Sequence, residues 1–428
     1  MTDTYFKQTE TNGINSYVWS TTKFKTNTIV VNIERPLSTE YATEHALMAQ
    51  VLRRGTARFP SLKAIKQHLD DLYGATFYSS VAKRGERHIL QFGLEIANEN
   101  FLSDQTPLLD EGIAFLGEIL AKPATKDGGF VEQYIASEKQ NLRQRIDSLI
   151  DDKIRYAAER CIGEMCHGEP YSVFNYGSTE QLAAIDRTSL YEAYENLLRT
   201  APIDVFVVGD VDVSEVQEAV TRHFRFAREQ GARERVAVAP VTHPVKDVRT
   251  VVEGLDVAQG KLNLGCRTQT DMKDSDYAAL MVYNGILGGF PHSKLFLNVR
   301  EKESLAYYAA SRLESHKGLL TIQSGIEIEN YERAVTIMRQ QLAEMTNGNI
   351  SDSELSQTKT MLANQLREIE DRPQAMIDFY YNGVLSGKQR SLPAYLEQID
   401  AVQKEDVVRV ASKIALDTIY FLRDRKEE

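Results

Sequence analysis

The apolar positions in the first half of the chain follow two different periods. Short runs rich in β-branched residues predict strands, because such side chains suit a pleated, half-buried surface. Apolar residues that recur at spacings of three and four predict amphipathic helices. On these patterns we expect strands at 29–33, 76–81, 88–96 and 205–208, and helices at about 39–54, 61–72, 108–120, 130–161, 180–198 and from about 214 onward.

The second half of the chain repeats this order of elements. Asp186 precedes Asp210 by as many residues as Asp400 precedes Asp424, and each interval holds a predicted helix followed by an apolar strand. Such a repeat predicts two equivalent α+β units. We expect strands at 261–267, 306–312, 319–326 and 418–422, and helices at 275–286, 295–302, 331–345, 353–370, 373–385 and over most of 394–414.

The length of the chain also argues for two domains. It has 428 residues, whereas single hydrophobic cores stop growing at roughly 250–300 residues. Residues 227–253 contain Gly231, a charged run, Pro240 and Pro244, a composition typical of linkers. We therefore predict an N-terminal domain over 1–226, a linker over 227–253 and a C-terminal domain over 254–428. An ordinary surface loop within one domain is the alternative for residues 227–253.

Charge and cysteine content narrow the possible partners and the location. Lys and Arg number 50 against 61 Asp and Glu, so the formal net charge is −11, and a protein that binds nucleic acid needs a basic face instead. The N-terminus lacks the order of a secretory signal, and no apolar run approaches the length of a membrane span. Three cysteines are too few and odd in number for a disulfide framework. These features predict a cytoplasmic protein that binds neither nucleic acid nor membranes.

The most specific local pattern is Asn-Val-Arg-Glu-Lys-Glu-Ser-Leu-Ala-Tyr at 298–307, which follows Gly-Ile-Leu-Gly-Gly at 285–289. Together with the duplicated layout and the passage 182–211, it resembles the pitrilysin-type, or inverzincin, zinc peptidases. The resemblance spans nearly the whole chain. It implies an α+β fold of two similar domains, each a mostly antiparallel sheet packed with helices, arranged as half of a clamshell.

Arg300 and Tyr307 match a pair that contacts substrate in the second domain of the resembled family. A phenol hydroxyl can donate a hydrogen bond to a carbonyl oxygen on which negative charge develops, and a guanidinium can hold peptide or anionic groups. The alternative is that Arg300 is a solvated cation at a helix end and Tyr307 a strand aromatic of the core.

The family's metal site is degenerate in this chain. The resemblance implies a His-x-x-Glu-His helix, whose two His bind zinc and whose Glu activates water, and a distant Glu that completes the site. Alignment on the end of that helix, Arg-Arg-Gly-Thr at 53–56, places Ala46, Ala49 and Gln50 at these three positions. A separate alignment of Glu-Lys-Gln at 138–140 on the family's Glu-Lys/Arg stretch places Arg145 at the position of the distant Glu. Alanine neither ligates zinc nor accepts a proton, and the positive charge of Arg145 would repel a zinc ion. We expect no metal in this chain.

A second register uses the pair Glu44-His45, with Tyr41 as the first ligand. A phenol whose pKa is near 10 is a poor zinc ligand at neutral pH. His45 also lies farther from Gly55 than the family pattern requires. We interpret it as an ordinary residue near the start of the helix, and an autonomous zinc peptidase that uses Glu44 and His45 stays a minor alternative.

Other candidate ligands are weaker. Cys161, Cys166 and His167 lie close in sequence but lack the Cys-x-x-Cys hook and a second pair. His88 and His292 have no evident Cys or carboxylate partner, so we interpret both as structural or solvent-facing.

The sequence thus favours a non-catalytic subunit of a pitrilysin-type peptidase, with no activity alone. In this hypothesis the chain forms a dimer with a zinc-bearing subunit that has intact His-x-x-Glu-His, and the two enclose a chamber for peptide substrates. Arg300 and Tyr307 then act in trans at the partner's zinc. A structural or peptide-binding scaffold without a role in proteolysis is the alternative from another class.

Overall fold

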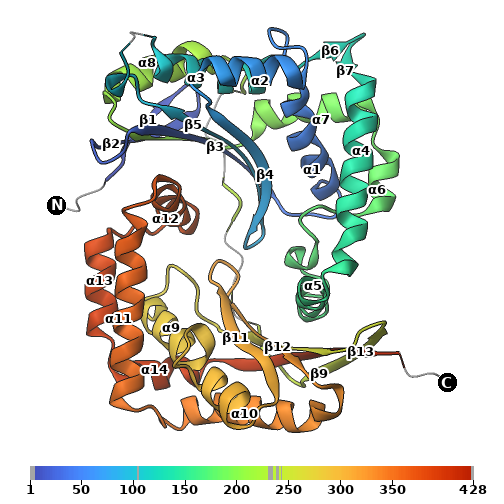
Figure 1. The fold of residues 1–428 in the computed structure, drawn as a ribbon, viewed down its shortest axis with the longest axis vertical. Helices are drawn as coiled ribbons and strands as arrows, with labels where there is room; N and C mark the ends of the chain where they lie inside the picture. Colours follow the sequence, from blue (N-terminus) through green and yellow to red (C-terminus); the bar gives the residue numbers. More distant parts are fainter. Residues whose placement is uncertain (1–4, 104–105, 230–234, 238–240, 242, 426–428) are drawn as a thin grey trace. The chain divides into compact units, whose positions relative to one another are not determined.

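The computed structural model describes all residues except 1–4, 104–105, 230–234, 238–240, 242 and 426–428 (Figure 1). Its contacts divide the chain into two compact units. The first unit comprises Met1–Asp147, Val173–Ala237 and Arg372–Phe379, and the second comprises Ser148–Ser172, Val238–Asp371 and Tyr380–Glu428. Residues 148–172 therefore pack with the second unit, although the predicted domain boundaries assign them to the first.

The first unit contains a six-stranded sheet in the order β1-β2-β8-β3-β5-β4. Neighbouring strands are antiparallel except for the parallel pair β2 and β8. Asn12 and Gly13 both have positive φ and connect β1 to β2, as a two-residue hairpin turn requires. The strands are β1 (Lys7–Thr11), β2 (Ile14–Ser20), β3 (Thr26–Pro36), β4 (Thr76–Arg84), β5 (Arg87–Ala97) and β8 (Ile203–Gly209).

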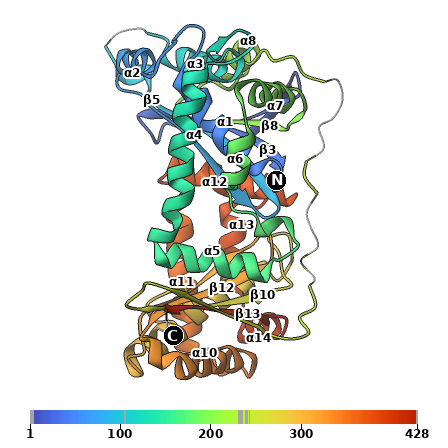
Figure 2. The ribbon, with the colours of Figure 1, turned by 90° about the vertical axis from the view of Figure 1, so that its right-hand side faces the viewer.

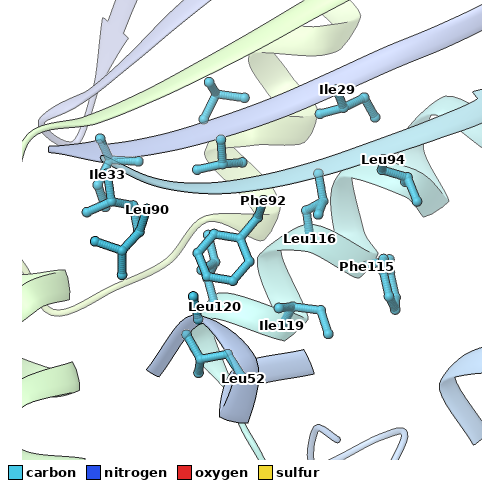
Figure 3. Close-up of a cluster of buried hydrophobic side chains, with 14 of the residues drawn as sticks. Ile29, Ile33, Leu52, Leu90, Phe92, Leu94, Phe115, Leu116, Ile119 and Leu120 are labelled. Atoms are coloured by element: carbon cyan, nitrogen blue, oxygen red, sulfur yellow. The ribbon is translucent and has the colours of Figure 1, made fainter. Parts of the chain in front are cut away.

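One face of this sheet carries the main core of the first unit. Ile29 and Ile33 of β3 and Phe92 of β5 pack against Leu116 and Leu120 of helix α3, below the sheet (Figure 3). All five side chains are almost fully buried, and burial of such groups is the dominant stabilising term. The helices of this unit are α1 (Ala42–Val51), α2 (Leu62–Asp71), α3 (Leu108–Ala121), α4 (Glu132–Asp147), α6 (Thr179–Ala184), α7 (Arg187–Thr200) and α8 (Val213–His223).

The second unit contains a five-stranded sheet in the order β11-β12-β10-β13-β9. Helix α5 (Lys153–Met165) lies against β10 and β13 of this sheet (Figure 2). The strands are β9 (Arg249–Leu255), β10 (Gly260–Arg267), β11 (Ala306–Glu314), β12 (Leu319–Ile326) and β13 (Ala415–Asp424). The other helices are α9 (Tyr277–Asn284), α10 (Tyr331–Thr346), α11 (Asp352–Ile369), α13 (Leu392–Ala401) and α14 (Lys404–Ala411), while α12 (Pro373–Ser386) contributes residues to both units.

Five strands of the first sheet and the five strands of the second share one topology, which confirms the predicted duplication of α+β units. In each sheet, the last strand of the unit in sequence, β8 or β13, lies between an antiparallel neighbour and a parallel one. Strand β13 pairs antiparallel with β10 and parallel with β9, as β8 pairs with β3 and β2. Strands β10, β12 and β11 therefore correspond to β3, β5 and β4.

Three local predictions differ from the structure. The helix expected over 130–161 is two helices, because Asp152 caps a new one by accepting a hydrogen bond from the Arg155 N–H. The helix expected over 180–198 also divides, since Asp186 caps α7. Residues 249–253 of the predicted linker belong to strand β9, and part of that linker, including Gly231 and Pro240, lies outside the described residues.

Candidate functional site: a helix without metal ligands

Helix α1 lies where the resemblance places the metal-binding helix, and most of its side chains pack in the protein core instead of facing a metal site. Ala46 and Ala49 are almost fully buried and belong to the main core of the first unit. Gln50 is half-buried. Ser79 of β4 donates a hydrogen bond to the carbonyl oxygen of Ala49 at 2.7 Å. The helix is therefore held by apolar packing and a main-chain contact at the positions where ligands would stand.

Helix α4, which packs against α1, carries the position of the distant ligand. Arg145 is exposed, and its guanidinium lies over the ring of Tyr176, 5.3 Å from the ring centroid. The buried carboxylate of this helix, Glu138, is paired with Arg54 at 2.9 Å. A zinc ion does not fit this arrangement, because two alanines, an amide and a cation occupy the four ligand and base positions.

The second register fails for a different reason: His45 already has a partner. Its Nδ1 lies 3.2 Å from the Nδ1 of His88, and both side chains are buried. The Nε2 of His88 lies 3.0 Å from the carbonyl oxygen of Asn175. Because this oxygen only accepts, His88 must carry its proton on Nε2, so its Nδ1 accepts the proton of His45 Nδ1. Both rings are then neutral.

The electrostatics of the His45–His88 pair agree with this assignment. Burial, reinforced by the charge of Lys83, lowers the pKa of His88 to about 4, against the favourable carbonyl of Asn175. Burial also lowers the pKa of His45 well below its usual value. His88 was expected to be structural or solvent-facing, and the structure makes it structural. The signal that sequence reading missed is the contact itself, which joins residues far apart in the chain.

The remaining members of the second register do not complete a metal site. Glu44 is half-buried, and burial together with Glu40 raises its pKa to about 7, although Arg35 acts in the opposite direction. Tyr41 is exposed and stacks on the ring of His45. Within the described part of the chain, no three His, Cys, Asp or Glu side chains gather as a metal site would require.

Arg300 and Tyr307 lie on the second unit and are both exposed. Arg300 belongs to a π-helical segment, Phe296–Lys302, where its guanidinium lies over the ring of Phe296 and 3.6 Å from the Glu301 carboxylate. Tyr307 belongs to β11, and 64% of its surface is exposed. Its hydroxyl donates to Glu327 Oε1 at 2.7 Å, which raises the pKa of Tyr307. Tyr307 is therefore not a core aromatic.

The cysteines offer no reactive centre. Cys161, Cys166 and Cys266 are all buried as free thiols. Burial raises the pKa of Cys161 and, to about 12, that of Cys266. The thiols of Cys161 and Cys266 therefore stay protonated at neutral pH and are poor nucleophiles and ligands.

Comparison with known proteins places this geometry in a family. A family model described as the Peptidase M16 inactive domain matches residues 184–362. The probable inactive metalloprotease YmfF of Bacillus subtilis strain 168 is 42% identical over 412 residues, which cover 96% of each chain. The chain belongs to the M16, or pitrilysin-type, peptidase family. It is a homologue of the inactive type, which agrees with its degenerate metal helix.

Two further relatives extend the comparison of this M16 homologue. The crystal structure of a conserved protein from Enterococcus faecalis V583 superposes with a TM-score of 0.90 at 32% identity, over 99% of this chain and 100% of that one. An uncharacterized zinc protease, YmxG, from the same Bacillus subtilis strain is 26% identical over 241 residues, which cover 56% of this chain and 57% of that protein. Among the described residues, no helix of the homologue has the length and apolar character for crossing a bilayer.

Proposed function

We propose that this M16 homologue is the non-catalytic subunit of a two-chain, cytoplasmic zinc peptidase. The proposal rests on a difference between the two units of the chain. The helix at the position of the metal helix has no ligands and packs as core at Ala46 and Ala49, while Arg300 and Tyr307, which match the substrate-contacting pair of the family, are exposed. Simple loss of function would give no reason to keep this pair.

In this proposal, the chain lends its second unit to the zinc site of a partner with intact His-x-x-Glu-His. The hydroxyl of Tyr307 donates a hydrogen bond to the carbonyl oxygen of the peptide as charge develops on it. The guanidinium of Arg300 holds the peptide or an anionic group beside it. The two chains enclose a chamber for unfolded peptides, and zinc belongs to the partner.

The occurrence of relatives supports a partner from the same cell. Bacillus subtilis strain 168 has both the probable inactive relative and a relative that is described as a zinc protease. An organism with both types can assemble a mixed pair. The partner of this chain is then expected to be a zinc-bearing M16 protein of its own organism.

The test is zinc content and peptide cleavage by the purified chain, alone and mixed with a zinc-bearing M16 protein from the same genome. We expect cleavage only from the mixture, with one zinc per pair. Tyr307→Phe and Arg300→Ala should each lower its turnover at least tenfold, whereas Tyr73→Phe, at an exposed tyrosine of the first unit, should leave turnover unchanged. Chelator-sensitive cleavage by the chain alone would contradict the proposal.

One observation favours the second candidate, a scaffold or peptide-binding protein without a role in proteolysis. The hydroxyl proton of Tyr307 is already donated to Glu327, so it reaches a peptide carbonyl only after this bond breaks. If a partner is found and both Tyr307→Phe and Arg300→Ala leave its turnover unchanged, the scaffold function stands.

A further inference from the structure

A row of polar side chains crosses the sheet of the first unit on the face opposite the main core. Asn15, Asp204, Asn32 and Gln91 are successive register partners on β2, β8, β3 and β5. Their sequence neighbours on β3, β5 and β8 point into the core, so these residues face the other side. Asn15 donates to Asp204 at 3.1 Å, and Gln91 donates to Asn32 at 2.9 Å.

Two of these side chains are fully buried, and one of them has a polar atom without a partner among the described residues. Asp204 and Asn32 have no exposed surface. The amide nitrogen of Asn32, one strand away from Asp204, has no hydrogen-bond partner in the described structure. Buried polar groups of this kind normally have a partner. The group of this row that can bind a cation is the buried carboxylate of Asp204.

The structure shows what binds there now: Arg235, from the segment that follows α8. Its guanidinium contacts both oxygens of Asp204, at 2.6 and 2.9 Å, and Glu34 at 2.8 Å. Glu34 is also fully buried, and Arg87 pairs with its other oxygen at 3.0 Å. Burial opposes the charge of Arg235, but the two carboxylates outweigh it and raise the pKa of the guanidinium.

The residue that follows is recognised through its main chain. The N–H of Val236 donates to Glu34 Oε1 at 3.0 Å, and its carbonyl oxygen accepts from Arg87 at 2.9 Å. Side-chain contacts to one residue and main-chain contacts to the next are how proteins bind extended peptides. The sheet therefore holds the dipeptide Arg235-Val236 as it would hold a peptide ligand.

The geometry discriminates between cations. The parallel pair of contacts from Arg235 to Asp204 uses the planar fork of a guanidinium, which an ammonium lacks. Glu34 and Asp204 carry two negative charges, and Arg87 supplies one positive charge. Among the described side chains that contact the two carboxylates, the guanidinium of Arg235 supplies the second positive charge. Packed apolar residues generally hold a segment at least as well as buried ion pairs do, so anchorage alone does not explain four charged groups.

We infer that Glu34, Asp204 and Arg87 form a binding site for an arginine residue of a peptide, and that the chain fills this site with its own Arg235-Val236. The segment is thus a built-in competitor of peptides that carry arginine followed by any residue with a free main-chain N–H. The inference goes beyond the proposed function, because it concerns the first unit alone and needs neither zinc nor a partner.

The test removes the Arg235 side chain from the site and adds an arginine dipeptide in solution. Isothermal titration calorimetry measures binding of acetyl-Arg-Val-amide to wild type, to Arg235→Ala and to the double variant Arg235→Ala/Asp204→Asn. We expect Arg235→Ala to bind acetyl-Arg-Val-amide at least tenfold more tightly than wild type or the double variant does. We also expect Arg235→Ala to bind acetyl-Lys-Val-amide at least tenfold more weakly than it binds acetyl-Arg-Val-amide. A folded Arg235→Ala that binds the arginine peptide no better than wild type would overturn the inference, as would equal binding of the lysine peptide.

A measurement on wild type covers the case in which Arg235→Ala does not fold. The amide hydrogen of Val236 is bonded to Glu34, so it exchanges slowly with solvent while the segment is bound. A saturating concentration of acetyl-Arg-Val-amide should speed its exchange at least severalfold, whereas acetyl-Gln-Val-amide should not. Unchanged exchange with the arginine peptide would contradict the inference.

Discussion

Acidification should destabilise the first unit through the His45–His88 pair. The folded pKa of His88 is about 4, below its ordinary value of 6.5, so the unfolded chain binds the proton more readily than the folded one. The stability that depends on neutral His88 is therefore fully present above pH 6.5 and is lost as the pH falls from 6.5 to 4. His45 titrates with the same sign, because its pKa is also lowered by burial.

The size of the effect follows from the shift. One pKa unit corresponds to about 1.4 kcal/mol, so the displacement of His88 amounts to about 3 kcal/mol of unfolding free energy between pH 6.5 and 4. His45 adds to this. The expected slope of stability against pH is about 1.4 kcal/mol per unit for each buried histidine below pH 6.5, a large part of a typical total of 5–15 kcal/mol.

Urea unfolding of wild type, His88→Gln and the control His167→Gln at several pH values from 7.5 to 5 checks this. His167 is exposed and serves as a matched substitution. Other titrating groups contribute equally to all three proteins, so the difference between variants isolates the pair. His88→Gln should flatten the slope by at least 1 kcal/mol per pH unit, and His167→Gln should not change it. Parallel curves for wild type and His88→Gln would refute the assigned neutral pair.

Two further predictions concern stability. Glu44→Gln should stabilise the protein at pH 8 by about 1–2 kcal/mol, after allowance for solvent screening of this partly buried group, because the folded pKa of Glu44, about 7, lies above the ordinary value of 4.5 and ionisation therefore destabilises the folded state. The gain in unfolding free energy, measured by urea unfolding, should vanish toward pH 5, and a gain independent of pH would contradict this cause. Gly117→Ala should lower stability by about 1–3 kcal/mol, because its Cβ would lie 2.6 Å from the main-chain oxygen of His223. The control Gly163→Ala, in helix α5 with open space around the new Cβ, should raise stability by about 0.5–1 kcal/mol, and equal melting temperatures of the two variants would contradict the packing argument.

Much of the fold followed from local pattern. The central strands β3, β5, β8, β10 and β12 contain apolar residues, and all but β10 also contain β-branched residues typical of a strand, so they were predicted although polar residues interrupt them. The π-helical segment Phe296–Lys302 was predicted as a short helix, since its hydrogen bonding differs by one residue only. The duplication was also readable, because it repeats element order rather than residues.

The strands that were missed lie at or near sheet edges. Strand β9 alternates between exposed and half-buried residues and follows a segment with two prolines, so its local composition resembled a linker. Its parallel pairing with β13, at the other end of the unit, has no local signature. For β1 and β2 a signal was present: Asn12-Gly13 is the typical sequence of a tight hairpin turn.

For the candidate site, too, part could be predicted from the sequence and part could not. The loss of ligands at Ala46, Ala49 and Gln50 was visible in the sequence, because residue chemistry alone excludes zinc there. The pairing of His45 with His88 and the capture of Arg235 were not visible, since each joins residues that are distant in the chain and that only the sheet brings together. Whether Arg300 and Tyr307 contact substrate stays a prediction.

The position of β8 and β13 within their sheets has a consequence for synthesis on the ribosome. Until β8 emerges, the hairpin β1–β2 has no strand to join it to β3, β5 and β4. Likewise, β9 is separated from β10, β12 and β11 until β13 has been synthesised. The nascent chain therefore exposes unpaired strand edges until β8 and β13 have been synthesised, and such edges are prone to aggregation. A chain that stops before Ala415 would lack β13 and would leave the second sheet in two pieces.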